Sequence, residues 1–334
     1  MKKKIVFAVI TFLALLIFGA LIYFYIDFSS GRQRVDKFYK DSKVEKIRNI
    51  GSTKTLEILP LVDWYTDRVD LKGEAGVSYL VKTDESLILF DVGMNKENED
   101  PSPLFYNMKR LGIDPDKIDV VIISHNHVDH VGGFKWISKK SFSLTNRQID
   151  LGNKRVYTPV LMTYPGLKPV SADQPTIISK GVATTGTLPS YLFFTGWTQE
   201  QALAINVAGK GIVLIVGCGH QTVPRLIERV SQLFNEPIVG IVGGLHYPVT
   251  DSRVMIVGIP VQMIYGTGKT PWSFVTMEDV NKNIVDLQKL KPEIVALSPH
   301  DSCDASLDAF RKAFPSSFRE IKVGKKLIIE DMHN

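Results

Sequence analysis

The sequence predicts a mixed α/β domain that follows a single membrane-spanning helix. An uncharged, almost wholly apolar run, residues 5–26, lies directly behind three lysines near the amino terminus. Beyond it, short apolar segments of strand length alternate with segments of helical spacing. Six of the seven histidines come directly after predicted strands, which is the arrangement expected of a metal site built on rigid elements.

The composition is that of an ordinary globular protein. Of the 334 residues, 44% are hydrophobic and 22% are charged, enough for a sizeable core in one large domain or two small ones. The net charge of +5 is modest and the basic residues are spread along the chain, so no nucleic-acid partner is expected. Cys218 and Cys303 fall in candidate site loops and therefore say little about the redox compartment.

Residues 5–26 are long enough, as a helix, to cross a bilayer core of about 30 Å. A cleavable secretory signal has a shorter apolar core, of about 7 to 15 residues. The run ends in an aromatic stretch, 23–26, typical of the membrane interface. We therefore expect an uncleaved, single-pass anchor in the cell membrane with a basic tail at 1–4 and a juxtamembrane linker at 27–55.

The charges that flank this run do not decide its orientation. Lys2 to Lys4 favour a cytoplasmic amino terminus, whereas six basic residues crowd the segment 32–46 on the other flank. A short basic tail before an apolar run has the form of an export signal. On that ground we expect the body, residues 56–334, to lie outside the cytoplasm.

The first half of the body reads as strands, one helix and a strand. We expect strands at 56–62, 76–82, 86–90 and 118–123, and a helix over 103–111 that stops at Gly112. The following stretch, 135–211, is rich in Pro, Gly and Thr and is expected to hold short strands, among them 176–179 and 203–207.

The second half repeats strand, loop and helix three times. The expected strands are 211–217, 237–242 and 293–297, and the expected helices are 222–234, 278–290 and 304–314. Thr276 and Asp279 have the spacing of a capping box at the start of the second helix. Two further segments, 318–323 and 326–330, are expected to be strands.

A cluster of potential metal ligands follows the strand 118–123. His125, His127, Asp129 and His130 lie within six positions, and the chain must curl to bring all four together. Imidazole nitrogen and carboxylate oxygen suit zinc, iron or manganese, and ligands this close can hold two ions. The alternative is a chance cluster on a solvated loop, but the following Gly132-Gly133 permits the tight turn that a metal site needs.

Three more histidines follow strands in the second half. They are His220, His246 and His300, and Cys218 precedes the first of them by two positions. A buried histidine bonded to the backbone is a reasonable alternative for any single one, and for His246 in particular. It is a poor explanation for all six histidines together.

The order of these motifs resembles the metallo-β-lactamase superfamily. Within it, the G-C-x-H loop ending at His220 and the G-G-x-H loop ending at His246 are similar to those of the dihydropterin-ribofuranosylaminobenzene-phosphate synthase-like subgroup. The likeness covers residues 56–330. It implies a four-layer αβ/βα sandwich, the metallo-β-lactamase fold, with a two-metal cleft at one sheet edge.

The resemblance also implies ligand roles for individual residues. One ion would be held by His125, His127 and His220, and the other by Asp129, His130 and His300. Asp91 would orient a ligating histidine through a hydrogen bond. Cys218 stands where many members have a metal-bridging aspartate, so it is either a thiolate ligand or a small buried residue. The His-Cys-Thr-Gly run common in the subgroup is replaced here by residues 300–303.

Together these features predict a hydrolase that binds two divalent ions, zinc in the first place, with manganese or iron also open. A metal-bound hydroxide would attack an ester, phosphoester or related bond of a small-molecule substrate. Asp129 would hold that hydroxide, and His246 would stabilise the developing oxyanion or bind substrate. A metal-binding transferase or synthase, or a ligand-binding protein with little turnover, remains an alternative, and the oligomeric state is open.

The segment 247–275 is unusually apolar for a connection between two site loops. It could be a lid over the cleft, a patch that faces lipid, or a hairpin of the core. The sequence alone does not choose among the three.

Overall fold

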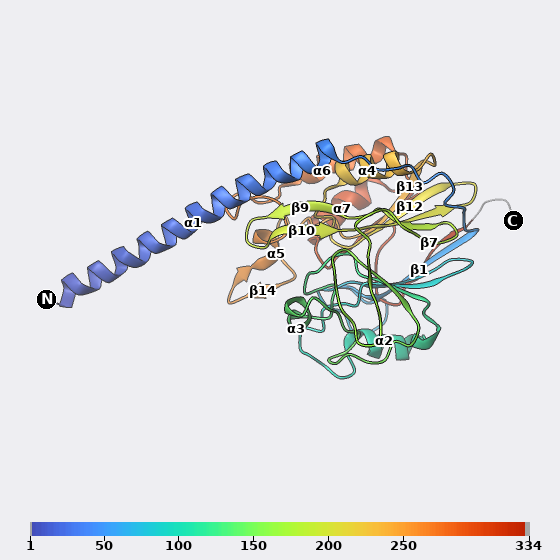
Figure 1. The fold of residues 1–334 in the computed structure, drawn as a ribbon, viewed down its shortest axis with the longest axis horizontal. Helices are drawn as coiled ribbons and strands as arrows, with labels where there is room; N and C mark the ends of the chain where they lie inside the picture. Colours follow the sequence, from blue (N-terminus) through green and yellow to red (C-terminus); the bar gives the residue numbers. More distant parts are fainter. Residues whose placement is uncertain (1, 331–334) are drawn as a thin grey trace.

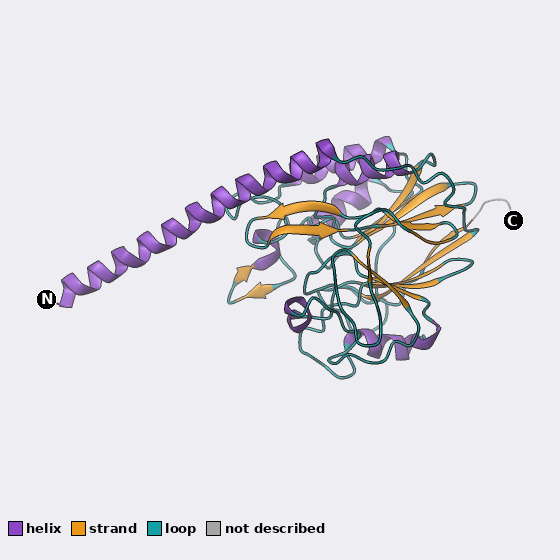
Figure 2. Ribbon diagram, viewed as in Figure 1, coloured by secondary structure: helices purple, strands orange, loops and turns teal. Residues whose placement is uncertain are grey.

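The computed structural model describes residues 2–330. Met1 of the expected basic tail and residues 331–334 of the expected domain, with the seventh histidine, His333, lie outside the described residues. Figures 1 and 2 show two β-sheets packed face to face, with helices on their outer faces and one long helix, α1 (Lys2–Asp41), projecting from the body. The predicted αβ/βα sandwich preceded by one long apolar helix is therefore confirmed.

The first sheet has seven strands in the order β17-β1-β2-β3-β4-β5-β6. Their bounds are β1 (Thr55–Val62), β2 (Ser78–Lys82), β3 (Leu87–Phe90), β4 (Val120–Ile122), β5 (Arg155–Thr158), β6 (Val170–Ser171) and β17 (Leu327–Glu330). Strands β3 to β6 run parallel to one another, whereas the pairs β17–β1, β1–β2 and β2–β3 are antiparallel. Helix α2 (Pro103–Leu111) buries Leu104 and Met108 against the outer face, followed by the 3₁₀ turn η1 (Pro115–Lys117) and α3 (Phe134–Ser138).

The second sheet has six strands in the order β16-β13-β12-β11-β8-β7. Their bounds are β7 (Ile177–Ser179), β8 (Val182–Thr184), β11 (Leu203–Val207), β12 (Gly211–Val216), β13 (Ile238–Gly243) and β16 (Ile294–Leu297). Three helices contribute apolar side chains to the core on the outer side of this sheet: α4 (Val223–Leu233), α6 (Met277–Lys289) and α7 (Asp304–Ala313). The parallel strands β12, β13 and β16 end at the same edge, where the loops with His220, His246 and His300 begin.

The core between the two sheets consists of inward-facing aliphatic and aromatic side chains from both. Tyr79 and Phe90 of the first sheet and Ile205 and Ile215 of the second are fully buried there. At about 25 cal/mol per Å² of apolar surface removed from water, such burial is the main force that holds the sheets together. The rigid edge of this sandwich is what positions the site.

Two short hairpins and one short helix lie outside the main sheets. The hairpins are β9 (Leu188–Leu192) with β10 (Gly196–Glu200), and β14 (Met255–Ile256) with β15 (Ile259–Pro260), which leads into α5 (Val261–Ile264). The expectation of a strand at 318–323 is wrong. Only Phe318 and Val323 make isolated bridges there, to Val295 of the edge strand β16 and to Thr66, so the segment pairs at single positions with two different partners and forms no continuous ladder.

Helix α1 continues without a break past the apolar run, to Asp41, and its last third packs on the body. Phe28, Gly31 and Val35 are buried against the hairpin β9–β10. Tyr191 of β9 lies across the backbone at Gly31 and hydrogen-bonds Asp27 through its hydroxyl group. The helix is thus fixed to the domain by side-chain packing.

Candidate metal centre

The loop after β4 curls tightly and gathers its histidines on one side. The amide groups of His130 and Val131 both donate to the carbonyl oxygen of His127, at 3.1 and 3.2 Å. The ring centres of His125 and His127 lie 4.5 Å apart, and those of His125 and His130 lie 4.1 Å apart. The curl expected from the spacing of these residues is therefore present.

Two sets of candidate ligands meet at the edge of the sandwich. The first consists of His125, His127 and His220, and the second of Asp129, His130, Cys218 and His300; within each set the candidate ligand atoms all lie within 4.8 Å of one another. A third set, Cys218, His220 and His246, overlaps with both. The structure thus brings together every residue that the sequence proposed as a metal ligand or catalytic group.

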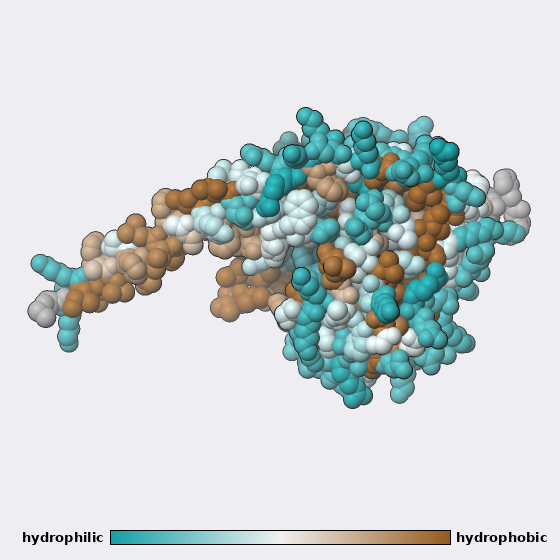
Figure 3. All heavy atoms as spheres, in the orientation of Figure 1, coloured by the Kyte–Doolittle hydropathy of each residue, from teal (hydrophilic) through white to brown (hydrophobic). Residues whose placement is uncertain are grey.

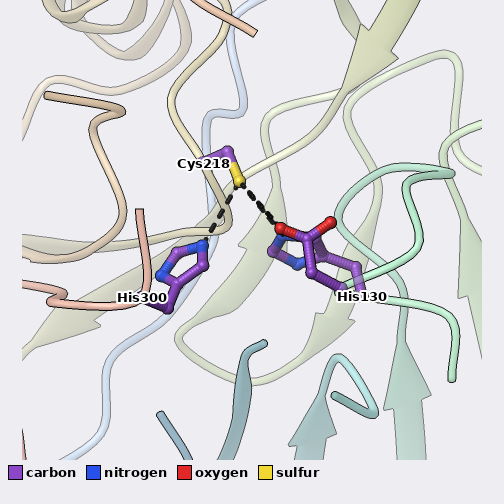
Figure 4. Close-up of side chains that lie close together, drawn as sticks. His130, Cys218 and His300 are labelled. Atoms are coloured by element: carbon purple, nitrogen blue, oxygen red, sulfur yellow. Dashed lines mark hydrogen bonds and ion pairs between the residues drawn. The ribbon is translucent and has the colours of Figure 1, made fainter. Parts of the chain in front are cut away.

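Cys218 lies between the rings of two histidines. Its Sγ atom is 3.1 Å from Nε2 of His130 and 3.3 Å from Nε2 of His300 (Figure 4). The nearest oxygen of Asp129 is 4.0 Å from the same sulfur. Burial raises the pKa of the Cys218 thiol well above its usual value, so a thiolate there needs a cation beside it.

Asp91, which follows β3, holds the loop after β4 (residues 124–130, the cradle loop) and the ring of His130. Its two carboxylate oxygens accept hydrogen bonds from the amide and the hydroxyl of Ser124, at 2.6 and 2.7 Å. The same carboxylate lies 2.7 Å from Nδ1 of His130, so Nδ1 carries the hydrogen and Nε2 is turned towards Cys218. This is the hydrogen bond that the resemblance implied for Asp91.

Asp63, at the end of β1, plays a similar part for His300. It accepts hydrogen bonds from Tyr79 Oη at 2.8 Å and from Ser298 Oγ at 2.6 Å. Ser298 Oγ in turn lies 2.6 Å from Nδ1 of His300 and accepts its hydrogen. Burial raises the pKa of Asp63 to about 6, although the hydrogen bonds it accepts favour the charged form and lower the pKa.

Glu200, the last residue of β10, holds the loop that carries Cys218 and His220. Its carboxylate accepts hydrogen bonds from the backbone amides of Cys218, Gly219 and His220 at 3.0, 2.9 and 2.9 Å. The side chain is fully buried, and burial raises its pKa to about 7 although the three amides favour the charged form. One carboxylate therefore sets the path of a whole ligand loop.

The segment that follows β15 hydrogen-bonds two of the histidine rings. His220 Nδ1 donates to the carbonyl oxygen of Gly266 at 2.8 Å. His246 Nε2 donates to the carbonyl oxygens of Tyr265 and Gln262 at 2.8 and 3.1 Å. Because a carbonyl can only accept, the free nitrogens of the neutral rings are Nε2 of His220 and Nδ1 of His246.

These free nitrogens fit a metal centre. Among the described residues, Nε2 of His125, Nε2 of His220 and Nδ1 of His246 are buried and have no hydrogen-bond partner. Buried polar atoms are nearly always paired, so such unpaired nitrogens, turned to one cluster, match the lone pairs that a metal ion would use. Burial lowers the pKa of His125 and of His220 well below the usual value, which keeps the lone pairs free of protons.

His130 differs from the other histidines of the cluster. Burial alone would lower its pKa, but the carboxylates of Asp129 and Asp91 hold that pKa well above the usual value. A metal ion in the second ligand set would therefore displace a proton from this ring.

Sequence reasoning missed the residues that support the ligands from behind. Asp63 directly follows an apolar strand, the same position as the histidines, and could have been found by that signal. Glu200 stands in an ordinary polar hairpin and carries no comparable signal. Gln262 donates its side-chain amide to the carbonyl oxygen of His300 at 2.7 Å from a segment that is remote in sequence.

The comparisons with known proteins agree with this geometry. The family model described as metallo-beta-lactamase superfamily matches residues 71–142, which include the cradle loop. The 7,8-dihydropterin-6-methyl-4-(beta-D-ribofuranosyl)-aminobenzene-5'-phosphate synthase of Methanocaldococcus jannaschii is 24% identical over 256 residues, covering 63% of this chain and 84% of that protein. An uncharacterised protein of the same archaeon is 24% identical over 202 residues, covering 51% of this chain and 72% of that protein.

A solved structure has the same fold. It is described as a metal-dependent hydrolase of the beta-lactamase superfamily and superposes with a TM-score of 0.55 at 20% identity, covering 83% of this chain and all of that one. At that identity the likeness shows the fold alone. The motifs, the family model over residues 71–142 and the fold thus agree in a similarity of this chain to the metallo-β-lactamase superfamily.

Proposed function

We propose that this chain is a membrane-anchored, metal-dependent hydrolase that acts on an ester, phosphoester or related bond of a small molecule. The observation that carries the proposal is the cluster of six imidazoles with Asp129 and Cys218, in which buried ring nitrogens have no protein partner. Two divalent ions, zinc in the first place and manganese or iron otherwise, would supply Lewis acidity and activate water there.

The chain's own residues would bind and orient the reactants. His125, His127 and His220 would hold one ion, and Asp129, His130 and His300 the other, with Cys218 between the two sets. Asp91 and Ser298 keep the hydrogens of His130 and His300 on Nδ1, which leaves Nε2 for the ion. The side chain of Asp129 is the partly exposed carboxylate of the cluster and would accept a hydrogen bond from the attacking water.

His246 would bind substrate. Its Nε2 hydrogen is committed to two backbone carbonyls, and burial lowers the pKa of its ring. In that state Nδ1 accepts a hydrogen bond and cannot donate one to an oxyanion. Each of the two proposed ions has three protein ligands without His246, so we propose a substrate hydroxyl or amide group, and not a metal ion, as the partner of this Nδ1 atom.

The membrane part of the proposal rests on α1. The helix is long and apolar enough to cross a bilayer, and its apolar side chains over residues 5–22 are exposed in the folded chain. Exposure of so much apolar surface is costly in water and favourable in lipid. We place the body outside the cytoplasm, as the export-signal form of the amino terminus favours.

Metal content and activity test the proposal together. The purified full-length chain, loaded with zinc or manganese, should bind two equivalents of metal and hydrolyse a member of a panel of esters, lactones, thioesters and phosphodiesters. His127→Ala should bind less metal and lose that activity, while Lys135→Ala on the exposed face of α3 should match the unaltered protein. If no activity on the panel disappears in His127→Ala although the variant remains folded, the hydrolase proposal fails.

A synthase is the second candidate, because a protein of that activity is 24% identical to this chain. Reaction in ¹⁸O-labelled water separates the two. A hydrolase transfers one solvent oxygen to its product, whereas group transfer between two substrates transfers none. A chain that binds metal and ligand but turns over neither class of substrate would be a binding protein.

A further inference from the structure

The hairpin β14–β15 presents an apolar tip to the solvent. Met255, Ile256 and Ile259 are each about half exposed, at 50%, 50% and 52%, and Val257 is 97% exposed. The hairpin pairs with no other strand of the described chain, and residues 254–268 include no charged side chain. A soluble surface rarely keeps a contiguous apolar patch of this kind, and a core hairpin would be buried.

The backbone conformation at the tip of the hairpin is unfavourable for Val257. Val257 and Gly258 form the turn with φ angles of 48° and 79°. Two-residue hairpin turns with both angles positive favour Asn, Asp or Gly, because a β-branched side chain is strained in that region. Val257 therefore destabilises the turn. An apolar environment around its exposed side chain would offset this cost.

The tip lies on the side of the body from which α1 projects. Figure 1 shows β14 below α1, on the side of the body from which the helix projects, and Figure 3 shows a hydrophobic patch in that place. Aromatic rings connect the two: Trp272 stacks on Tyr25 at 6.2 Å between ring centres, and Phe194 contacts both Phe24 and Tyr265, at 5.7 and 5.2 Å. Tyr and Trp side chains of this kind gather where a protein crosses the surface of a bilayer.

We propose that the tip of hairpin β14–β15 enters the lipid headgroup layer beside α1, so that the chain contacts the bilayer at two places. The proposal rests on the proposed anchoring by α1, whose aromatic end places the membrane surface at the level of Tyr25. Residues 254–268 have no charged side chain to desolvate, and the apolar side chains at the tip would leave water for the boundary between headgroups and acyl chains.

The same segment reaches the metal centre. Only a few residues beyond the tip, Gln262, Tyr265 and Gly266 accept the ring hydrogens of His246 and His220. A hairpin held in lipid therefore places one wall of the candidate site next to the membrane surface. The wall and the tip are one continuous stretch of chain.

Depth-dependent quenching tests the proposal on the full-length chain in phosphatidylcholine–phosphatidylglycerol vesicles. A fluorescent label is attached in turn at Val257→Cys, at Leu15→Cys within α1, and at Val69→Cys, a fully exposed position on the body. Cys218 and Cys303 are buried, so the unaltered chain reports the background labelling. Phosphatidylcholine that carries a doxyl group on its acyl chain is the quencher.

The proposal expects labels at Val257 and Leu15 to be quenched at least twofold more than the label at Val69. Quenching at Leu15 while Val257 behaves like Val69 overturns the hairpin contact and leaves the anchor intact. Quenching at Val257 without quenching at Leu15 overturns the anchor and, with it, the contact with the bilayer at two places. If neither is quenched, both fail.

Discussion

Cys218 is the residue whose chemistry most affects what the centre can bind. Its sulfur lies within 3.3 Å of two ring nitrogens, and with Asp129 these atoms form one candidate ligand set. A thiolate is a softer ligand than a carboxylate and favours zinc over manganese. Burial keeps the free thiol protonated, so ligation and deprotonation would occur together.

We predict that Cys218→Ser removes a thiolate ligand. The cobalt-loaded protein should show a thiolate-to-metal charge-transfer absorption that is lost in Cys218→Ser and retained in Cys303→Ser. Cys303 is the matched control, because it is also buried but its sulfur lies 3.3 Å from Ser306 Oγ and outside the candidate ligand sets. An unchanged absorption in Cys218→Ser would show that the residue only fills space.

At the scale of elements, the site consists of loops that strands deliver to one edge and that buried carboxylates hold in place. Asp91 holds the loop after β4, Asp63 acts through Ser298 on the loop after β16, and Glu200 holds the loop after β12. Each carboxylate comes from an element other than the one it supports. The ligand positions therefore depend on the pairing of distant parts of the chain.

Glu200→Gln should weaken this arrangement. A neutral amide replaces a carboxylate that accepts three backbone hydrogen bonds, and a buried donor left without a partner costs about 1–3 kcal/mol. We expect the free energy of unfolding of the metal-free protein to fall by about that amount in urea titrations, and the bound metal to decrease. Glu57→Gln, at a half-exposed surface ion pair with Lys326, should change neither by more than about 0.5 kcal/mol.

How far the sequence predicts these elements depends on the range of the interactions involved. Helix α2 was predicted with its observed bounds, because Ser102 caps its start and Gly112, with φ of 68°, ends it through local contacts. The capping box at Thr276 is also observed. The order of strands in each sheet and the contact of Glu200 with the loop 218–220 are long-range, and no local pattern specifies them.

The candidate site shows the same contrast between features set by local sequence and features set by long-range contacts. The histidines could be found because each follows an apolar strand, and the loop after β4 holds four of the proposed ligands within six positions. Which of them share a ligand set was implied by the family resemblance and not by spacing. Gln262 and Gly266, which set the tautomers of His246 and His220, lie in a segment whose sequence predicts no contact with the site.

The packing of α1 on the body depends on Gly31. A Cβ atom at position 31 would overlap the ring of Tyr191, whereas one at Gly19 in the same helix would meet no atom within 4 Å. Gly31→Ala should therefore loosen the packing of residues 27–41, at a cost of about 1–3 kcal/mol. In detergent micelles we expect faster tryptic cleavage at Arg32 and Arg34, and no change in Gly19→Ala. Equal cleavage in both variants would contradict the role of Gly31 in packing α1 on the body.

At the scale of the whole molecule, the helix that carries the candidate membrane span also packs on the domain that carries the candidate site. Residues 27–41 pack on β9–β10, and Arg225 of α4 pairs with Asp36 at 2.5 Å. Under the proposed anchoring, the orientation of α1 would therefore decide on which side of the membrane the candidate metal centre lies.

We predict that the body is accessible from outside the cell. Protease added to intact cells that express the chain with a carboxyl-terminal tag should remove the tagged body, and a cytoplasmic marker protein should remain whole. The ground is the export-signal form of the amino terminus, a short basic tail followed by an apolar run, because the flanking charges alone do not decide the orientation. Complete protection of the body, with digestion only after the cells are opened, would reverse the orientation.

The unbroken course of α1 has a consequence for which molecules the centre can meet. Residues 27–41 add about 15 residues of helix beyond the apolar run, roughly 22 Å at 1.5 Å per residue, and they are fixed to the body. A flexible tether would let the domain sample a range of heights above the lipid. With the anchoring and activity proposed above, the fold would fix the height of the candidate metal centre above the membrane. Two substrates with the same reactive bond would then differ in rate by how far that bond lies from the membrane plane.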